Sequence, residues 1–193
     1  MIAWLLHGIY DFSLIEKFLS GYDTVRPEDI YQNLHPARKA LITPIIPDWS
    51  GFSAAWQKSK PQTETFWDPD TGLITEQGEA VRSKSEKIIA DKYYSLHIPY
   101  LYEKPLVLKD GRKKITLHPD FTILKKGHFK EYYHEHFGLM DHPDYCKKAL
   151  RKIALYRKNS IFEGDRLLIT FETSEQPLNI PELQTAIEHF LSE

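Results

Sequence analysis

The chain has a single cysteine, Cys146, among its 193 residues, so it forms no internal disulfide bond. This fits a reducing compartment, and we expect the protein to be cytoplasmic. The sequence also lacks any apolar run that approaches the ~18 residues of a membrane span. Its apolar first residues carry no basic leader, so we expect no signal peptide and no membrane partner.

A strong charge of one sign is also lacking, because the formal net charge is -2. A uniformly basic nucleic-acid-binding protein is thereby excluded. The charge is uneven, however: residues 104–158 are rich in Lys, Arg and His, while acidic residues gather near the C-terminus. A local basic face is therefore compatible with the sequence. With 41% apolar and 27% charged residues, the composition predicts a packed domain rather than a disordered chain.

The first 80 residues predict a helical arm followed by a loop that wraps around the core. Apolar residues recur every three or four positions over residues 1–20, which is typical of an amphipathic helix. Pro27 suits the first turn of a second helix, which we expect to reach about Leu41. The loop carries four large aromatic residues, Trp49, Phe52, Trp56 and Trp67. We expect them to anchor the loop, with stacking on a substrate as the alternative.

Residues 81–193 predict an α/β core. Ser83 and Glu86 have the spacing of a capping box at a helix start, and Asp110-Gly111 indicates a hairpin turn. The run 166–171, which is largely apolar after Arg166, is typical of a buried strand. The predicted elements are a helix at 83–95, strands at 99–108, 115–124 and 129–137, a helix at 142–159, a strand at 166–171 and a helix at 180–191. Helices on a small mixed sheet make an α/β sandwich.

Three acidic residues fall in three of these elements: Glu86 in the first helix, Asp120 in the second strand and Glu135 in the third. A carboxylate in an apolar strand is costly unless something pairs with it. Neighbouring strands can bring Asp120 and Glu135 side by side, and Glu86 can reach them directly or through water. Oxygen ligands suit Mg²⁺, so the sequence predicts a metal site that activates water toward a phosphoryl group.

These residues, in this order of elements, resemble the PD-(D/E)XK nuclease superfamily. The likeness is greatest to very-short-patch-repair-like endonucleases and to the nuclease domains fused to some bacterial helicases. Those domains carry strings that look like Arg-Ser-Lys-Ser-Glu, Tyr-Glu-x-Pro-Leu, Pro-Asp-Phe, Glu-His-Phe-Gly and Lys-x-x-x-Tyr. The strings stand here at Arg82–Glu86, Tyr102–Leu106, Pro119–Phe121, Glu135–Gly138 and Lys152 with Tyr156. The resemblance covers residues 80–191, and the ordered set is more specific than any one string.

The resemblance implies a restriction-endonuclease-like αβββαβ core with a helical N-terminal arm. It implies a metal-dependent nuclease that acts on DNA in preference to RNA, with Asp120, Glu135 and Glu86 binding Mg²⁺ or Mn²⁺. The chain departs from the family in one place. The third motif of the family has a lysine two residues after the acid, where this chain has Phe137. Lys152, on the next helix, is expected to supply that charge, as in some branches of the superfamily.

Other residues near these motifs receive supporting roles. Tyr156 lies one helical turn from Lys152 and is expected to contact a phosphate or to orient a metal-bound water. His136 is a candidate general base or substrate contact. Arg82 and Lys84 lie at a helix N-terminus, which favours anions, and are expected to hold the nucleic-acid backbone.

Each candidate also has a purely structural interpretation. Asp120 would cap a turn, Glu135 would be a surface residue of an edge strand, and Glu86 would serve only the capping box. Lys152 and Tyr156 would lie on a solvated helix face. His136 would be a packing histidine.

Two alternatives concern the site as a whole. Two histidines and a carboxylate can bind zinc, but His134 and His136 flank Glu135 in a strand and so share the opposite face. The absent strand lysine favours a catalytically inactive nuclease-fold module that binds nucleic acid or a helicase or defence partner. A homodimer through the N-terminal helices is a further expectation.

Overall fold

The computed structural model describes residues 30–31, 33–42, 47–59 and 72–192. Internal contacts divide the chain into two units, residues 1–48 and 49–193, whereas the sequence pattern changes character at residue 80. The helix expected over residues 1–20 and the side chain of Trp67 lie outside the described residues. No helix of the described part is long and apolar enough to cross a membrane.

The second predicted helix is wrong in its described part, because it is interrupted. Asn33 and Leu34 lie in a turn, and a separate short helix, α3 (Pro36–Lys39), follows. His35 has φ -55° and ψ 139° and acts as the N-cap of α3. The residue before a proline is driven out of the helical region, so His35 cannot continue a helix and Pro36 begins a new one.

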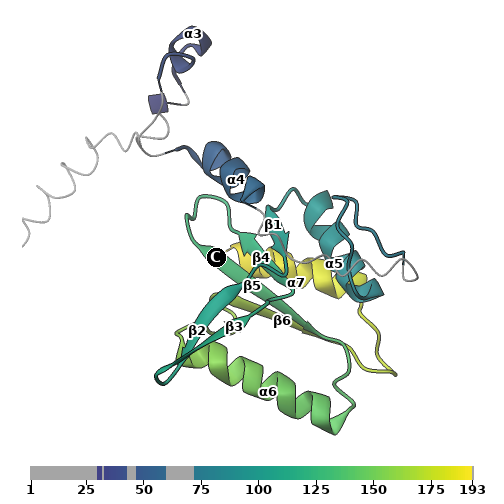
Figure 1. The fold of residues 1–193 in the computed structure, drawn as a ribbon. Coiled ribbons are helices and arrows are strands. Elements are labelled where there is room, and N and C mark those ends of the chain that lie inside the picture. Colours follow the sequence, from purple (N-terminus) through teal and green to yellow (C-terminus); the bar gives the residue numbers. More distant parts are fainter. Residues whose placement is uncertain (1–29, 32, 43–46, 60–71, 193) are drawn as a thin grey trace, which may run out of the picture. The chain divides into compact units, whose positions relative to one another are not determined.

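The second unit is a mixed α/β structure (Figure 1), which confirms the predicted class. Its strands are β1 (Tyr100–Tyr102), β2 (Leu106–Asp110), β3 (Lys113–Leu117), β4 (Phe121–Leu124), β5 (Glu131–Phe137) and β6 (Leu167–Phe171). The main sheet has the order β1-β4-β5-β6, and β2 and β3 form a separate two-stranded sheet. Within the main sheet only the β5–β6 pair is parallel.

Two predicted strands are each broken into two. The expected strand at 99–108 is interrupted at Glu103, which has φ 48°. The expected strand at 115–124 is interrupted at 118–120, where Pro119 has no N–H to give to a ladder. The middle of the long hairpin thus separates as β2–β3, and Gly111, with φ 61°, forms the predicted turn at its tip.

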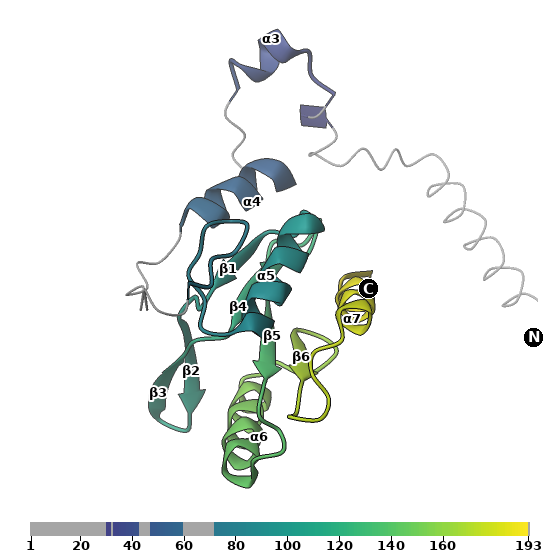
Figure 2. The ribbon, with the colours of Figure 1, turned by 90° about the vertical axis from the view of Figure 1, so that its right-hand side faces the viewer.

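Three helices cover the two faces of the main sheet (Figure 2). Helices α5 (Lys84–Ser95) and α7 (Ile180–Ser192) cover one face, and α6 (Pro143–Lys158) covers the other. The α5–α7 side buries a large apolar cluster that includes Ile89, Tyr93, Phe121, Ile123, Leu183 and Ile187. Fully burying each such side chain contributes roughly 1.5–3 kcal/mol, so this cluster is the main source of stability. The predicted helices of the core are confirmed within two residues at each end.

Strand β6 differs from its prediction as a buried strand. It is the last strand of the sheet order, and Phe171 is 54% exposed. The apolar run is explained by Leu167, which is fully buried in the cluster under α6. An edge strand can therefore carry a continuous apolar run when helices cover part of both its faces.

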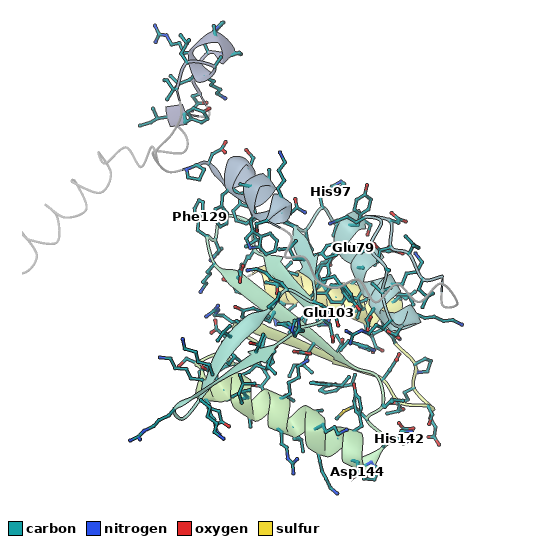
Figure 3. All side chains as sticks on the ribbon, viewed as in Figure 1. Glu79, His97, Glu103, Phe129, His142 and Asp144 are labelled. Carbon is teal, nitrogen blue, oxygen red and sulfur yellow. The ribbon has the colours of Figure 1, made fainter. Side chains whose placement is uncertain are left out.

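Helix α4 (Trp49–Lys58) occupies part of the region expected to be a wrapping loop. Its aromatic residues do anchor it, as Phe52 packs on Phe129 with ring centroids 5.0 Å apart. Trp56 donates from Nε1 to Glu131 Oε1 at 2.6 Å. Phe129 lies in the turn between β4 and β5 (Figure 3), so α4 belongs to the second unit.

Candidate active site

Two carboxylates meet where strand β4 begins beside strand β5. Strands β4 and β5 are antiparallel, and their register pairs Phe121 with His134. Asp120, one residue before Phe121, is therefore opposite Glu135, one residue after His134. Asp120 is held there because its Oδ2 accepts the backbone N–H of His136 at 2.6 Å. The break before β4 leaves Asp120 partly exposed, while Glu135 is 1% exposed.

Helix α6 supplies two partners to the buried carboxylate. Lys152 Nζ lies 2.5 Å from Glu135 Oε2, and the Tyr156 hydroxyl donates to Glu135 Oε1 at 2.5 Å. The two side chains reach the same group because positions i and i+4 share one helix face. Glu135 is therefore neither an edge-strand surface residue nor unpaired, and neither oxygen lacks a hydrogen bond.

The two carboxylates perturb one another. Burial and the nearby charge of Glu135 raise the pKa of Asp120 to about 7. Burial also raises the pKa of Glu135, an effect that Lys152 and Tyr156 oppose. Burial and the charge of Glu135 raise the pKa of Tyr156, so its hydroxyl stays protonated and donates. Charge-bearing groups with raised pKa values in one place are typical of functional sites.

A cavity of about 210 Å³ opens beside this pair. It is lined by Asp120, Glu135, Phe137, Tyr145, Lys148 and Lys152, among others. One wall is thus the carboxylate pair and the other is a helix with two ammonium groups. Such a cavity can receive an anionic group against the lysines while its reacting centre faces the carboxylates.

The third predicted carboxylate is held separately. Glu86 Oε2 accepts the backbone N–H of Arg82 at 2.9 Å and the hydroxyl of Tyr102 at 2.7 Å. Ser83 accepts from the Glu86 N–H, so the predicted cap is present, although the Glu86 carboxylate reaches Arg82 rather than Ser83. The charge of Glu86 still contributes to the raised pKa of Asp120. In the described part of the chain, no three His, Cys, Asp or Glu side chains are close enough together to hold a metal ion.

Glu103 lies near the site, although no motif in the sequence singles it out as a site residue. It pairs with Arg82 at 2.9 Å, and burial raises its pKa. It lies between the β2–β3 hairpin and α5 (Figure 3). The Tyr-Glu-x-Pro-Leu string contains it, but the predicted unbroken strand gave no reason to place its side chain near Glu86. Arg82 and Lys84 are both exposed.

The histidines of β5 lie on the opposite face of the sheet from Glu135, as the strand period predicts. His134 lies 2.7 Å from the Tyr93 hydroxyl and 2.9 Å from Thr170 Oγ1, and His136 Nδ1 lies 2.9 Å from the same hydroxyl. Burial lowers the pKa of His134 to about 3. The His136 ring is therefore a buried network residue, and its backbone N–H is the group that touches Asp120. This arrangement gives no support to a zinc site with Glu135.

No protein-family model and no solved structure matches the chain. Among curated proteins, Uncharacterized protein MJ1519 of Methanocaldococcus jannaschii is 31% identical over 121 residues. The aligned stretch is 55% of this chain and 10% of that protein. The chain thus spans about a tenth of the length of the curated relative, and the name of that relative assigns no activity.

Proposed function

We propose that the protein is a metal-dependent nuclease with a restriction-endonuclease-like core, acting on DNA. The observation that supports this is the meeting of Asp120 and Glu135 at one cavity, with Lys152 reaching the same carboxylate from α6. Each of the three comes from a different element, so the arrangement does not arise from local sequence. The order α5, strands, α6, β6 and the resemblance of the motifs support the same class.

The residues fit a divalent cation of the Mg²⁺ or Mn²⁺ type. Asp120 and Glu135 offer oxygen ligands, and their mutual repulsion, which raises the pKa of Asp120, is the feature that a cation relieves. Mg²⁺ is commonly held by one or two protein carboxylates, with water and substrate phosphate completing its shell. When bound, such an ion polarises a phosphoryl oxygen and lowers the pKa of an attacking water. The Glu86 carboxylate already accepts hydrogen bonds from Arg82 and Tyr102, so the proposal does not require it to bind the cation directly.

The side chains of the protein then have distinct tasks. Lys152 stabilises negative charge that develops on the phosphate, because its ammonium group lines the cavity within reach of Glu135. Tyr156 donates to one oxygen of Glu135, so the orientation of this carboxylate does not depend on Lys152 alone. The His136 backbone N–H fixes Asp120 in the same way. Lys148, on the cavity wall, holds a further phosphate oxygen.

Plasmid nicking in Mg²⁺ and in Mn²⁺ tests the proposal with Asp120→Ala and wild type. We expect the variant to lose nicking and calorimetric metal binding together while its circular dichroism is unchanged. Asp144→Asn is a matched control, since that side chain is 92% exposed on the outside of α6. Unchanged nicking in Asp120→Ala would refute the proposal.

A second function is favoured by one observation: both Glu135 oxygens are already occupied by Lys152 and Tyr156. The ammonium group thus lies where a cation would neutralise the pair, as in a nuclease fold that binds nucleic acid or a partner protein without cleaving. Salt-dependent DNA binding with no product in any divalent metal would support this function. Metal-dependent product formation would exclude it.

A further inference from the structure

The basic residues of this chain are concentrated in one stretch. Residues 104–158 hold fourteen Lys and Arg against six Asp and Glu, although the whole chain has a net charge of -2. This stretch contains the β2–β3 hairpin and α6, and nitrogen-tipped side chains fringe both elements (Figure 3). The exposed basic residues with no ion pair among the described residues include Lys109, Arg112, Lys113, Lys114, Lys148 and Arg151.

The hairpin is fastened to the C-terminal end of α6. Asn159 accepts the backbone N–H of Lys109 at 2.8 Å and donates to its carbonyl at 2.9 Å. Lys158 pairs with Asp110 at 2.7 Å, and Leu108 is buried against Tyr156 and its neighbours. The hairpin is thus fixed against α6, which also forms a wall of the cavity. We call the exposed basic residues of these two elements the hairpin–α6 surface.

The hairpin keeps a charge arrangement that weakens the isolated protein. Its register places Lys109 directly opposite Lys114, and both are exposed. Like charges at directly opposed positions of an antiparallel pair are destabilising. A polyanion on this face would remove the repulsion, because each phosphate can lie between two ammonium groups.

The surface carries charge without stacking groups. Residues 106–117 contain no Phe, Tyr or Trp, and the aromatic residues of α6 are the partly buried Tyr145 and the fully buried Tyr156. Proteins that bind single strands place exposed aromatic side chains under the bases. Charge without such rings suits the sugar–phosphate backbone of a duplex, and a two-stranded ribbon also fits a duplex groove.

We infer that the hairpin–α6 surface binds the backbone of duplex DNA and delivers it to the cavity at Asp120 and Glu135. This inference rests on the proposed nuclease function and names duplex, rather than single-stranded, DNA as its substrate. Lys109 and Lys114 contact phosphates, and Asn159 positions them through the backbone of the hairpin.

The test is binding of a fluorescent 20-base-pair duplex, and of one of its strands, in EDTA across a range of KCl concentrations. The variant is Lys109→Gln with Lys114→Gln. The control is Lys126→Gln with Lys130→Gln, which removes the same charge from the β4–β5 turn at the other end of β4. A plot of log K against log salt has a negative slope, and each lost phosphate contact makes it shallower by about 0.9. For the hairpin variant alone, we therefore expect a slope that is shallower by nearly two and duplex binding that is at least tenfold weaker.

The same variant has a second readout, because removing the opposed charges should leave its melting temperature equal to or above that of wild type. Equal duplex affinity and salt slope in the hairpin variant and wild type would overturn the inference. The inference would also be overturned if the wild-type protein bound the single strand more tightly than the duplex, or if it failed to bind the duplex at low salt. Nicking assays on the same samples separate the two proposals: a hairpin variant that binds and nicks like wild type refutes only the hairpin–α6 surface, while duplex binding without nicking refutes only the nuclease.

Discussion

Asp120→Asn should stabilise the metal-free protein at pH 8 while it abolishes cleavage. The pKa of Asp120 is raised from 3.8 to about 7 by burial and by Glu135. A raised folded-state pKa means that folding disfavours the ionised form. The cost is small at pH 4, where the carboxyl is protonated in the folded state and only partly ionised in the unfolded state, grows between pH 4 and pH 7, and is complete above pH 7.

The size of the effect follows from the shift. Three pKa units correspond to about 4 kcal/mol, and because Asp120 is partly exposed, solvent screening reduces this to roughly 2 kcal/mol. Asn has the same shape as Asp and keeps a side-chain oxygen, which can still accept the His136 N–H that lies 2.6 Å from Asp120 Oδ2. The gain in unfolding free energy should therefore appear at pH 8 and be small at pH 4.

Urea unfolding in EDTA at pH 4, 6 and 8 measures the effect, with Asp144→Asn as the exposed control. The difference between variant and wild type should grow with pH for Asp120→Asn, and this growth should exceed any seen for the control. Equal or lower stability of Asp120→Asn at pH 8 would mean that the carboxylate pair is not under electrostatic strain. Adding Mg²⁺ should then stabilise wild type by RT ln(1 + [Mg²⁺]/Kd), about 2.7 kcal/mol at a hundredfold excess over Kd, and leave Asp120→Asn unchanged.

Three further predictions test the surroundings of the pair. Tyr156→Phe keeps the buried ring but removes the hydroxyl from Glu135, so urea unfolding should show a loss of about 1–3 kcal/mol; no loss would show that the hydrogen bond does not form. Lys152→Gln should lower the initial rate of nicking roughly 100-fold, by analogy with the loss of one charge-stabilising donor, while Lys147→Gln, an exposed lysine of α6 that pairs with Asp144, changes that rate by much less. Similar rates for the two variants would remove Lys152 from the proposed mechanism. Thr170→Val leaves two buried histidine rings without their shared hydroxyl and should cost about 1–3 kcal/mol in the same unfolding assay, whereas an unchanged midpoint would show that the rings find other partners.

The adjacency of Asp120 and Glu135 could be predicted from the sequence because it depends on local rules. A hairpin signal brings two strands together, and the strand period then decides which side chains share a face. The same period correctly placed His134 and His136 opposite Glu135. The contact of Lys152 and Tyr156 with one carboxylate also follows in part, since their spacing puts them on one helix face.

Other features depend on backbone conformations and distant contacts that no periodicity reports. The positive φ of Glu103 breaks a strand that reads as continuous, and the break brings its side chain to Arg82. The separation of β2–β3 depends on this break and on Pro119. The position of the Glu86 carboxylate depends on a hydrogen bond from the Tyr102 hydroxyl, and Tyr102 is 16 residues from Glu86 in the sequence. No local pattern could therefore tell whether Glu86 joins the other carboxylates.

The position of Phe137 explains why the positive charge comes from α6. Phe137 is 4% exposed and packs with Ala149 and Ile153, so an ammonium group at this position would lose its hydration inside an apolar cluster. Lys152 instead approaches Glu135 from the helix with its side chain 27% exposed, and its charge stays hydrated at the cavity. Phe137 on the strand thus contributes to the apolar core, and Lys152 on the neighbouring helix provides the positive charge that pairs with Glu135.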